Sequence, residues 1–272
     1  MKKIKEVQGL LQVPLLFVFL IFASSLSAET PSEVKLESFL HKYSDSIYQD
    51  LVIGNDIYPV GSDQCEPRYE LIKPVLDGYN RPFSVLDLGA AQGYFSLRIA
   101  HEYPHSACVM VEANNTAYYA HHGDMLYDLC LFNSHLNNIF YLHRRMDLAD
   151  LSYLNCEEHF DVVIAFLVVH LMHETLQEQI KIIQKLLKVG DNVILEVAND
   201  VGVIHTAYVE YLSQSIDCQY LGEVKRHKDP QSTSTGKLFW FKRKNPQFID
   251  RNEFPIKNET FINLGGVYPH GA

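Results

Sequence analysis

Residues 85–96, which read VLDLGAAQGYFS, combine residue types that could bind a ligand. Gly89 and Gly93 bracket a turn between an expected strand and the helix after it. Small residues at such a turn let a ligand approach the backbone, and the helix N-terminus presents unpaired N–H groups. Glu112 lies 19 residues beyond Gly93, where a carboxylate can accept hydrogen bonds from both ribose hydroxyls. The glycine turn and the spaced acid together indicate a nucleoside cofactor.

The apolar pattern predicts the strands that must position these residues. Short apolar runs alternate with helical segments after residue 82, and continuous runs such as 162–164 are typical of parallel strands buried on both faces. We expect strands at 83–88, 107–112, 139–142, 160–165, 192–197, 220–225 and 237–242. The last two follow each other without enough chain for a crossover helix. They are therefore expected to form an antiparallel pair at the sheet edge.

Helical spacing of apolar residues occurs in three further places. It predicts helices over 34–51, near 68–76 and over 174–188, the last of which Gly190 is placed to stop. Residues 54–62 are rich in turn formers. The segment after residue 244 is polar and weakly periodic, so we expect residues 245–272 to form an extended tail.

The order and spacing of these segments resemble the class I S-adenosylmethionine-dependent methyltransferases. Residues 85–96 look like the first motif of that family, and VMVEAN at 109–114 is similar to its ribose-binding strand end. MDLADL at 146–151, FDVVIAFLVVHLM at 160–172 and LLKVGDNVILEV at 186–197 resemble the segments of its third, fourth and fifth strands. The resemblance covers roughly residues 68–244. It departs from the family at Ala91, which stands where the family has the middle glycine of the turn.

The resemblance implies a fold and an activity. The fold is a Rossmann-like three-layer α/β sandwich with a mostly parallel seven-stranded sheet and an antiparallel C-terminal β-hairpin. The activity is transfer of a methyl group from S-adenosylmethionine to an O or N nucleophile of a small molecule or polypeptide. Asp87 would order the glycine loop and approach the methionine amino group, while Glu112 would hold the ribose and Asp147 the adenine. The residues that would let the cofactor lie against the backbone are Gly89, Ala91 and Gly93.

The methyl acceptor is less defined than the cofactor. Residues 165–168 read AFLV, instead of the Asn/Asp-Pro-Pro-aromatic motif of amino-group nucleobase methyltransferases, and no Pro-Cys pair occurs. His170 and His173 follow the fourth strand, where a neutral imidazole could deprotonate a hydroxyl or orient an acceptor. Either histidine could instead cap or pack against the following helix. Three residues at the end of the fifth strand could line the acceptor pocket: Glu196, Asn199 and Asp200.

Composition limits the classes of partner. Apolar residues make up 47% of the 272 residues, so a core can form. The formal net charge of −10, without a strong basic patch, disfavours duplex nucleic acid. The thirteen histidines and five cysteines show no metal-ligand spacing, so we expect no metal site and mainly buried thiols.

The N-terminus has the three parts of a secretory signal peptide. Lys2, Lys3 and Lys5 precede the apolar run 13–23, and the small residues of 24–28 follow it. We expect residues 1–28 to be a signal peptide or a membrane anchor, which makes the protein exported or membrane-anchored; the alternative is a cytoplasmic protein. Membrane contact is expected only through this segment if it is uncleaved. The expected divisions are then 1–28, a helical lead-in at 29–82, the methyltransferase domain at 83–244 and the tail at 245–272.

Two other functions fit parts of the pattern. A NAD(P)-dependent oxidoreductase would also use a glycine turn and Glu112, but it predicts a sheet that continues in parallel. A non-catalytic exported protein that keeps the fold would explain why an export signal precedes a domain whose cofactor is made in the cytoplasm. Asn114 begins an Asn-x-Thr sequon two residues past Glu112, where a glycan would obstruct the cofactor. Arg68 is expected to be a surface charge, or alternatively part of a lid over the cofactor.

Overall fold

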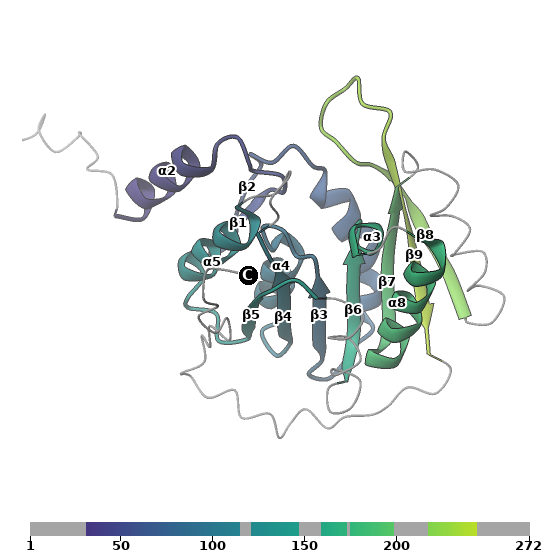
Figure 1. Cartoon of the computed structure of the whole chain (residues 1–272). Helices are drawn as coiled ribbons and strands as arrows, with labels where there is room; N and C mark the ends of the chain where they lie inside the picture. The colour runs from purple at the N-terminus through teal and green to yellow at the C-terminus, as the bar shows by residue number, and fades with distance from the viewer. Residues whose placement is uncertain (1–30, 115–120, 147–158, 173–174, 199–216, 244–272) are drawn as a thin grey trace, which may run out of the picture. The chain divides into compact units, whose positions relative to one another are not determined.

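The computed structural model describes residues 31–114, 121–146, 159–172, 175–198 and 217–243 (Figure 1). The chain divides into two compact units, residues 1–44 and 45–272. In the first unit, α2 (Pro31–Tyr43) carries Phe39 and Tyr43 one turn apart, with their rings edge to face at a centroid distance of 4.9 Å. The expectation of one helix over 34–51 is wrong at its end, because Leu51 begins a strand of the second unit.

The second unit opens with a short hairpin that the sequence pattern did not reveal. Its strands β1 (Leu51–Ile53) and β2 (Asp56–Tyr58) pair antiparallel around a tight turn. Gly54 has φ +59°, a left-handed conformation that glycine adopts without strain. Three-residue strands are too short to show an alternating apolar pattern. The turn formers of 54–62 therefore predicted a loop where a hairpin lies.

A seven-stranded sheet forms the centre of this unit. Its strand order is β5-β4-β3-β6-β7-β9-β8. The five strands from β5 to β7 are parallel neighbours, and β9 pairs antiparallel with both β7 and β8. In chain order the strands are β3 (Ser84–Leu88), β4 (Ala107–Glu112), β5 (Ile139–His143), β6 (Phe160–Phe166), β7 (Gly190–Ala198), β8 (Asp217–Lys225) and β9 (Thr235–Lys242). All seven expected strands are present, with ends that differ by a few residues.

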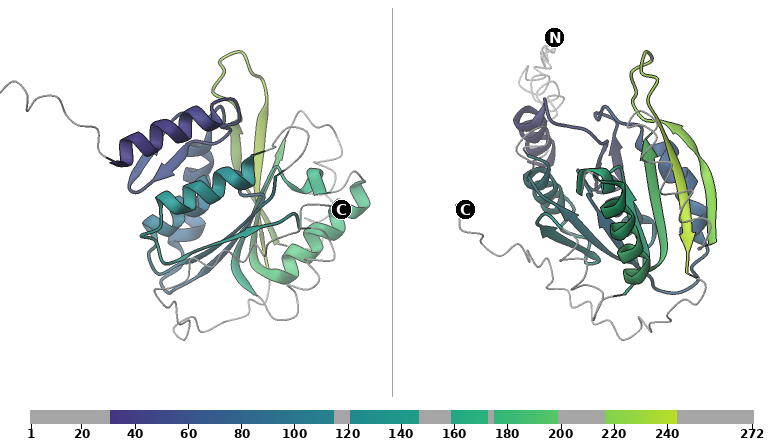
Figure 2. Two further views of the ribbon diagram at one scale, coloured as in Figure 1. Left: turned by 60° about the vertical axis from the view of Figure 1, so that its left-hand side comes forward. Right: turned by 45° about the vertical axis from the view of Figure 1, so that its right-hand side comes forward.

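Helices cover both faces of the sheet (Figures 1 and 2). Helices α3 (Cys65–Asp77) and α4 (Tyr94–Glu102) lie on one face, and α8 (Leu176–Val189) lies on the other. Two more helices complete the described part, α5 (His122–Phe132) and α7 (Val169–Met172). The three-layer α/β architecture with an antiparallel C-terminal hairpin, expected from the resemblance, is confirmed.

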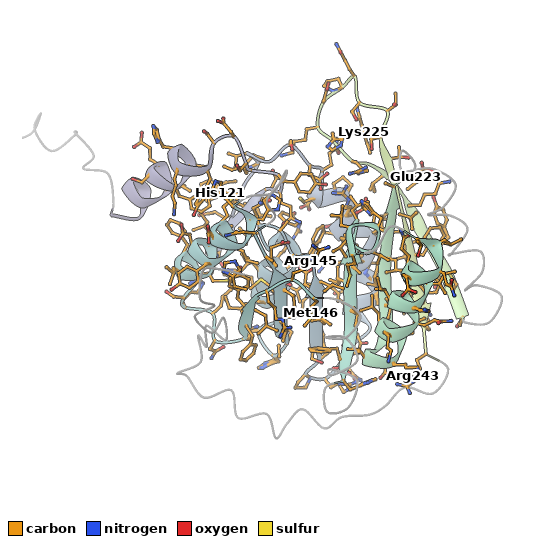
Figure 3. The ribbon with its side chains drawn as sticks, viewed as in Figure 1. His121, Arg145, Met146, Glu223, Lys225 and Arg243 are labelled. Carbon is orange, nitrogen blue, oxygen red and sulfur yellow. The ribbon has the colours of Figure 1, made fainter. Side chains whose placement is uncertain are left out.

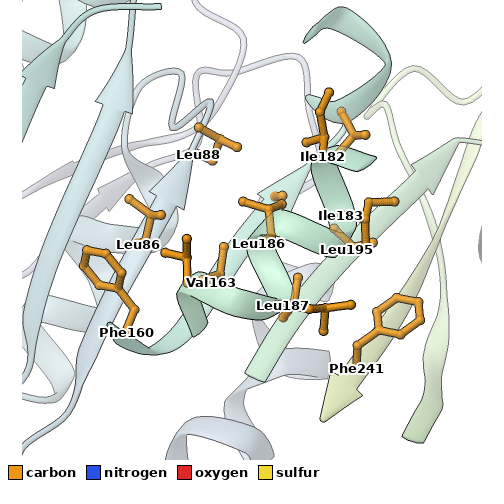
Figure 4. Close-up of a cluster of buried hydrophobic side chains, with 14 of the residues drawn as sticks. Leu86, Leu88, Phe160, Val163, Ile182, Ile183, Leu186, Leu187, Leu195 and Phe241 are labelled. Carbon is orange, nitrogen blue, oxygen red and sulfur yellow. The ribbon is translucent and has the colours of Figure 1, made fainter. Parts of the chain in front are cut away.

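The apolar stripe of α8 explains why that helix packs where it does. Ile182, Ile183 and Leu186 are buried against Leu86 of β3 and Val163 of β6, at the helix–sheet interface drawn in Figure 4. Thr175 caps the helix by accepting a hydrogen bond from the backbone N–H of Glu178. The stripe anchors β6 and β7, so the carboxyl ends of these strands are held in place for the site described below.

The connection between β8 and β9 reaches back to the start of the unit. The backbone N–H of Gln64 donates to the carbonyl of Arg226 at 2.7 Å, and that of Lys228 donates to the carbonyl of Ser62 at 2.9 Å. Asp63 and His227 form an isolated antiparallel bridge between the same segments. These hydrogen bonds hold the residues just before α3 beside the residues just after β8, although more than 160 positions separate them in the chain.

Four cysteines lie in the described residues, and all four are free thiols. Cys65, Cys108 and Cys130 are buried, and Cys218 is partly exposed. Cys156 lies outside the described residues. Among the helices that the structure describes, none is long and apolar enough to cross a membrane. The expected leader, residues 1–28, lies outside them.

Candidate functional site

A cavity of about 320 Å³ lies at the carboxyl ends of the parallel strands. Leu88 ends β3, Glu112 ends β4 and Phe166 ends β6, and all three line it. Glu196, near the end of β7, lines it as well. This edge is where open α/β sheets bind ligands, because the loops after the strands diverge there. The volume is within the range of small-molecule sites.

The glycine turn forms one wall of the cavity through Gly89 and Ala91. Gly89 has φ +74° and Ala91 has φ +51°, so the chain turns twice through the left-handed region. That region disfavours residues with a Cβ, and Ala91 is therefore strained where a glycine would not be. A Cβ placed on Gly89 would lie 2.6 Å from Cγ2 of Val168, which itself lines the cavity. Only glycine at 89 admits this close packing of the residues after β6.

Glu112 ties the glycine turn to the end of β4. One carboxylate oxygen accepts a hydrogen bond from the backbone N–H of Ala91 at 2.7 Å, and the other accepts from the N–H of Ala113 at 2.9 Å. Burial raises the pKa of this carboxyl, and the two backbone donors oppose the rise. Glu112 is thus a hydrogen-bond acceptor at the cavity wall, and its binding of a ribose stays a prediction.

Asp87 and Gly93 stand one layer behind the wall, because neither lines the cavity. Asp87 is buried and accepts a hydrogen bond from Oγ of Ser96 at 2.8 Å. Burial raises its pKa to about 7. At Gly93 a Cβ would lie 2.6 Å from Cδ1 of Leu126, so this glycine serves helix packing. The two residues order the turn from beneath.

A segment before β1 holds the turn from the opposite side. The side-chain carbonyl of Gln49 accepts hydrogen bonds from the backbone N–H groups of Gln92 and Tyr94, at 3.1 and 3.2 Å. The side-chain carbonyl of Gln92 accepts in return from the N–H of Gln49 at 2.7 Å. Gln49 therefore satisfies N–H groups at the N-terminus of α4 that the helix itself leaves unpaired. It also lines the cavity.

A buried ionic cluster of Asp63, Arg68 and Glu196 forms another part of the cavity wall. Nε of Arg68 donates to Oε1 of Glu196 at 2.9 Å, and its Nη1 and Nη2 donate to the two carboxylate oxygens of Asp63. Each of the three residues is at most 3% exposed. The expectation that Arg68 is a surface charge is wrong, because α3 directs it inward toward Asp63, five positions before it, and Glu196, 128 positions after it.

Glu196 has one carboxylate oxygen engaged and one without a partner. Within the described residues, Oε2 is buried and makes no hydrogen bond. Burial raises the pKa of Glu196 to about 7, although the positive charge of Arg68 opposes the rise. Gly236 of β9 makes room for the side chain, since a Cβ at 236 would overlap Oε1.

Aromatic and basic residues complete the lining. Tyr48 and His122 stack with centroids 6.4 Å apart, and burial lowers the pKa of His122 to about 4, so this imidazole is neutral at physiological pH. The residues after β5 include Arg145 and Met146, which are labelled in Figure 3. Arg144 precedes them and also lines the cavity.

The structure places the expected site residues in three groups. The expected residues that line the cavity are Gly89, Ala91, Glu112, His170 and Glu196, and their roles stay predictions. Asp87 and Gly93 lie behind the wall, as described above. The residues that lie outside the described part of the chain are His173, Asp147, Asn199 and Asp200.

Sequence reasoning missed several lining residues. Asp63 and Arg226 were not singled out, and Tyr48 fell within an expected helix. No spacing rule connects positions 63, 68, 196 and 226. Arg68 stands in the first turn of an apolar helix and is followed by a tyrosine. This local pattern is the same for a buried arginine and for an exposed one, so it does not predict burial.

Solved structures resemble this chain at the level of the fold. The bifunctional kinase-methyltransferase WbdD superposes with a TM-score of 0.57 and 20% identity, over 79% of this chain and 47% of its own. The N-terminal domain of EvdMO1, crystallised in the presence of SAH and D-fucose, gives a TM-score of 0.54 and 12% identity over 79% of this chain and 100% of that domain. This chain thus spans about half the length of the WbdD chain.

Sequence comparison adds no closer relative. No protein-family model matches the chain, and no curated protein matches it. The strand order, the antiparallel hairpin and the superpositions nevertheless agree with one another. The chain has the Rossmann-like fold of the class I S-adenosylmethionine-dependent methyltransferases.

Proposed function

We propose that the protein is an S-adenosylmethionine-dependent methyltransferase that acts on an O or N nucleophile of a small molecule or polypeptide. The observation that carries the proposal is the position of Gly89, Ala91 and Glu112 together on one wall of the cavity. A methyl donor of this kind needs an acceptor for its ribose hydroxyls beside a backbone that it can approach closely. The cavity offers both.

The side chains present fit this cofactor. Glu112 is a carboxylate acceptor at the end of β4, and the adjoining backbone of Ala113 and Asn114 also lines the cavity. Val111 and Met146 supply apolar surface of the kind that a purine ring needs. When bound, S-adenosylmethionine supplies an electrophilic methyl group on a sulfonium. The protein's own part is to hold donor and acceptor together and to take up a proton where the acceptor loses one.

The antiparallel edge of the sheet favours this proposal over an oxidoreductase. An oxidoreductase of the type considered above predicts a sheet that continues in parallel, whereas β9 pairs antiparallel with β7 and β8. The ligand named for the EvdMO1 domain, SAH, is the product of donating the methyl group. Both points support the methyltransferase assignment and neither identifies the acceptor.

Calorimetric titration of the whole chain with S-adenosylmethionine, S-adenosylhomocysteine and NAD tests the proposal. We expect micromolar binding of the first two and none of NAD. Binding of NAD alone would replace the proposal with the oxidoreductase. If none of the three binds to a protein that circular dichroism shows to be folded, the non-catalytic alternative is favoured.

A further inference from the structure

We propose that Glu196 forms the acceptor subsite and is the general base, and that the acceptor is a neutral hydroxyl group. This inference rests on the proposed function and deepens it. It starts from Glu196, a residue that lines the cavity and whose side chain is fully buried. Its carboxylate oxygen Oε2 has no hydrogen-bond partner within the described residues. A buried acceptor without a donor is uncommon in folded proteins. Because the side chain of Glu196 is fully buried, a hydroxyl donor on a ligand reaches Oε2 after a small movement of the cavity wall.

The rest of the cluster fixes the orientation of this carboxylate. Nε of Arg68 holds Oε1 at 2.9 Å, and both carboxylate oxygens of Asp63 hold the guanidinium from its other side. Gly236 leaves the space in which Oε1 lies. Because Oε1 is engaged in this way, Oε2 remains for the acceptor. Asp63 and Arg68 are positioning residues, since they act through Glu196.

The charges around Glu196 select the class of acceptor. The groups that face it are Arg68 from α3, Asp63 from the segment before α3, Arg226 from the segment after β8, and Tyr48. Two carboxylates and two guanidinium groups nearly cancel. A protonated amine would meet two cations, and an anionic acceptor would meet two acids, so a neutral O–H group fits best.

The reaction balances without a further reactant. The acceptor oxygen forms a bond to the methyl carbon as the bond between that carbon and the sulfonium sulfur breaks. The proton of the hydroxyl passes to Oε2, and the sulfur keeps the electron pair of the broken bond, which leaves a neutral thioether. Glu196 must begin as a carboxylate. Its pKa of about 7 allows this form near neutral pH while leaving the group basic enough to accept a proton.

The Glu196→Gln variant is the main test. Its amide oxygen can still accept from Nε of Arg68, so we expect the fold to be kept. The matched control is Glu223→Gln, because Glu223 is exposed on β8, at the sheet edge (Figure 3). Transfer of labelled methyl from S-adenosylmethionine is measured with cyclohexanol, benzyl alcohol and phenol, against cyclohexylamine and benzylamine.

We expect label in the hydroxyl compounds, at a rate that rises with pH and levels above about pH 7. Glu196→Gln should lower this rate at least a hundredfold while the Kd for S-adenosylhomocysteine stays within twofold, and Glu223→Gln should change neither. Label in the amines alone would overturn the inference. So would a Glu196→Gln rate within threefold of wild type.

A second readout does not depend on turnover. Infrared difference spectra of the wild type between pH 5 and 9 should show protonated carboxyl intensity from both Asp87 and Glu196 that titrates near pH 7. In the Asp87→Asn background only the Glu196 band remains, and it should be missing from the Asp87→Asn/Glu196→Gln double variant. Absence of such a band difference would overturn the inference. Failure of the proposed function is recognised separately. If the wild type does not bind S-adenosylhomocysteine, both the proposed function and this inference are wrong. Binding without transfer to any hydroxyl compound removes this one alone.

Discussion

The two sides of the cavity are built in different ways. The side at β3 and β4 uses backbone: Gly89, Ala91 and Glu112 come from 24 consecutive residues and are joined by hydrogen bonds to main-chain N–H groups. The side at β7 and β9 uses charge: Arg68 joins Asp63 and Glu196, from elements far apart in the chain. We expect the fold to tolerate the loss of a single side chain from the first arrangement. We expect the second to depend on the cation that its two acids share.

Arg68→Met should show the largest effect and tests this contrast directly. It leaves the carboxylates of Asp63 and Glu196 buried without their cation, which typically lowers the free energy of unfolding by about 3–5 kcal/mol. Urea denaturation measures the loss. The control is Lys73→Met on the same helix, whose ion pairs are partly exposed and should contribute less than about 1 kcal/mol. Equal losses for the two variants would contradict the contrast.

Glu112→Ala should act on binding more than on folding. We expect the affinity for S-adenosylhomocysteine to fall by about 1.5–3 kcal/mol, since hydrogen bonds to a charged acceptor are lost. Calorimetry measures it, with the exposed Glu70→Ala as control. If the affinity is unchanged, Glu112 does not hold the ribose, and the β3–β4 side loses its assigned role.

Asp87→Asn sharpens the comparison between the two buried acids. The pKa of Asp87 in the folded protein lies above its ordinary value of 3.8, so its contribution to stability is full below that value and is lost as the pH rises through about 7. The variant has no such loss. The difference in the free energy of unfolding between the variant and the wild type should therefore move in favour of the variant by on the order of 2 kcal/mol from pH 5 to pH 8.

Thermal melts across this pH range measure the gain of Asp87→Asn, with the exposed Asp56→Asn as control. A gain that does not grow with pH would mean that Asp87 is already ionised in the folded protein at pH 5. The hydroxyl of Ser96 would then be enough to stabilise its charge.

Ala91→Gly should have the smallest effect. It removes about 1–2 kcal/mol of left-handed strain at φ +51°. Because glycine loses more conformational entropy on folding, about 0.5–1 kcal/mol of this is offset, and the free energy of unfolding should rise by about 0.5 kcal/mol. Denaturant unfolding measures it. The same replacement at Ala100, within α4, should instead destabilise by about 1 kcal/mol. Destabilisation at both positions would place the turn outside the left-handed region.

The same contrast explains what the sequence could predict. The strands, α8 and the glycine turn follow from contiguous residues, because apolar periodicity and turn chemistry are local properties. Glu112 was found for the same reason, as a fixed spacing from Gly93 places it at the next strand end. The localisation and the leader stay predictions, since residues 1–28 lie outside the described part.

The ionic side was only partly within reach of sequence reasoning. Glu196 was expected at the pocket because it ends a strand, yet its partner Arg68 was assigned to the surface. Burial of an arginine depends on whether two acids meet it, and these lie 5 and 128 positions away. The β1–β2 hairpin was missed because three-residue strands carry too little pattern.

The space at Gly236 has a consequence for how the protein can evolve. A Cβ at 236 would overlap Oε1 of Glu196 in its present position, so we expect the two positions to change together. In homologous sequences, we expect a residue with a Cβ at 236 to occur only where 196 holds something shorter than glutamate. Such co-variation between residues of the neighbouring strands β7 and β9 would show which homologues have an acid at position 196 and which do not.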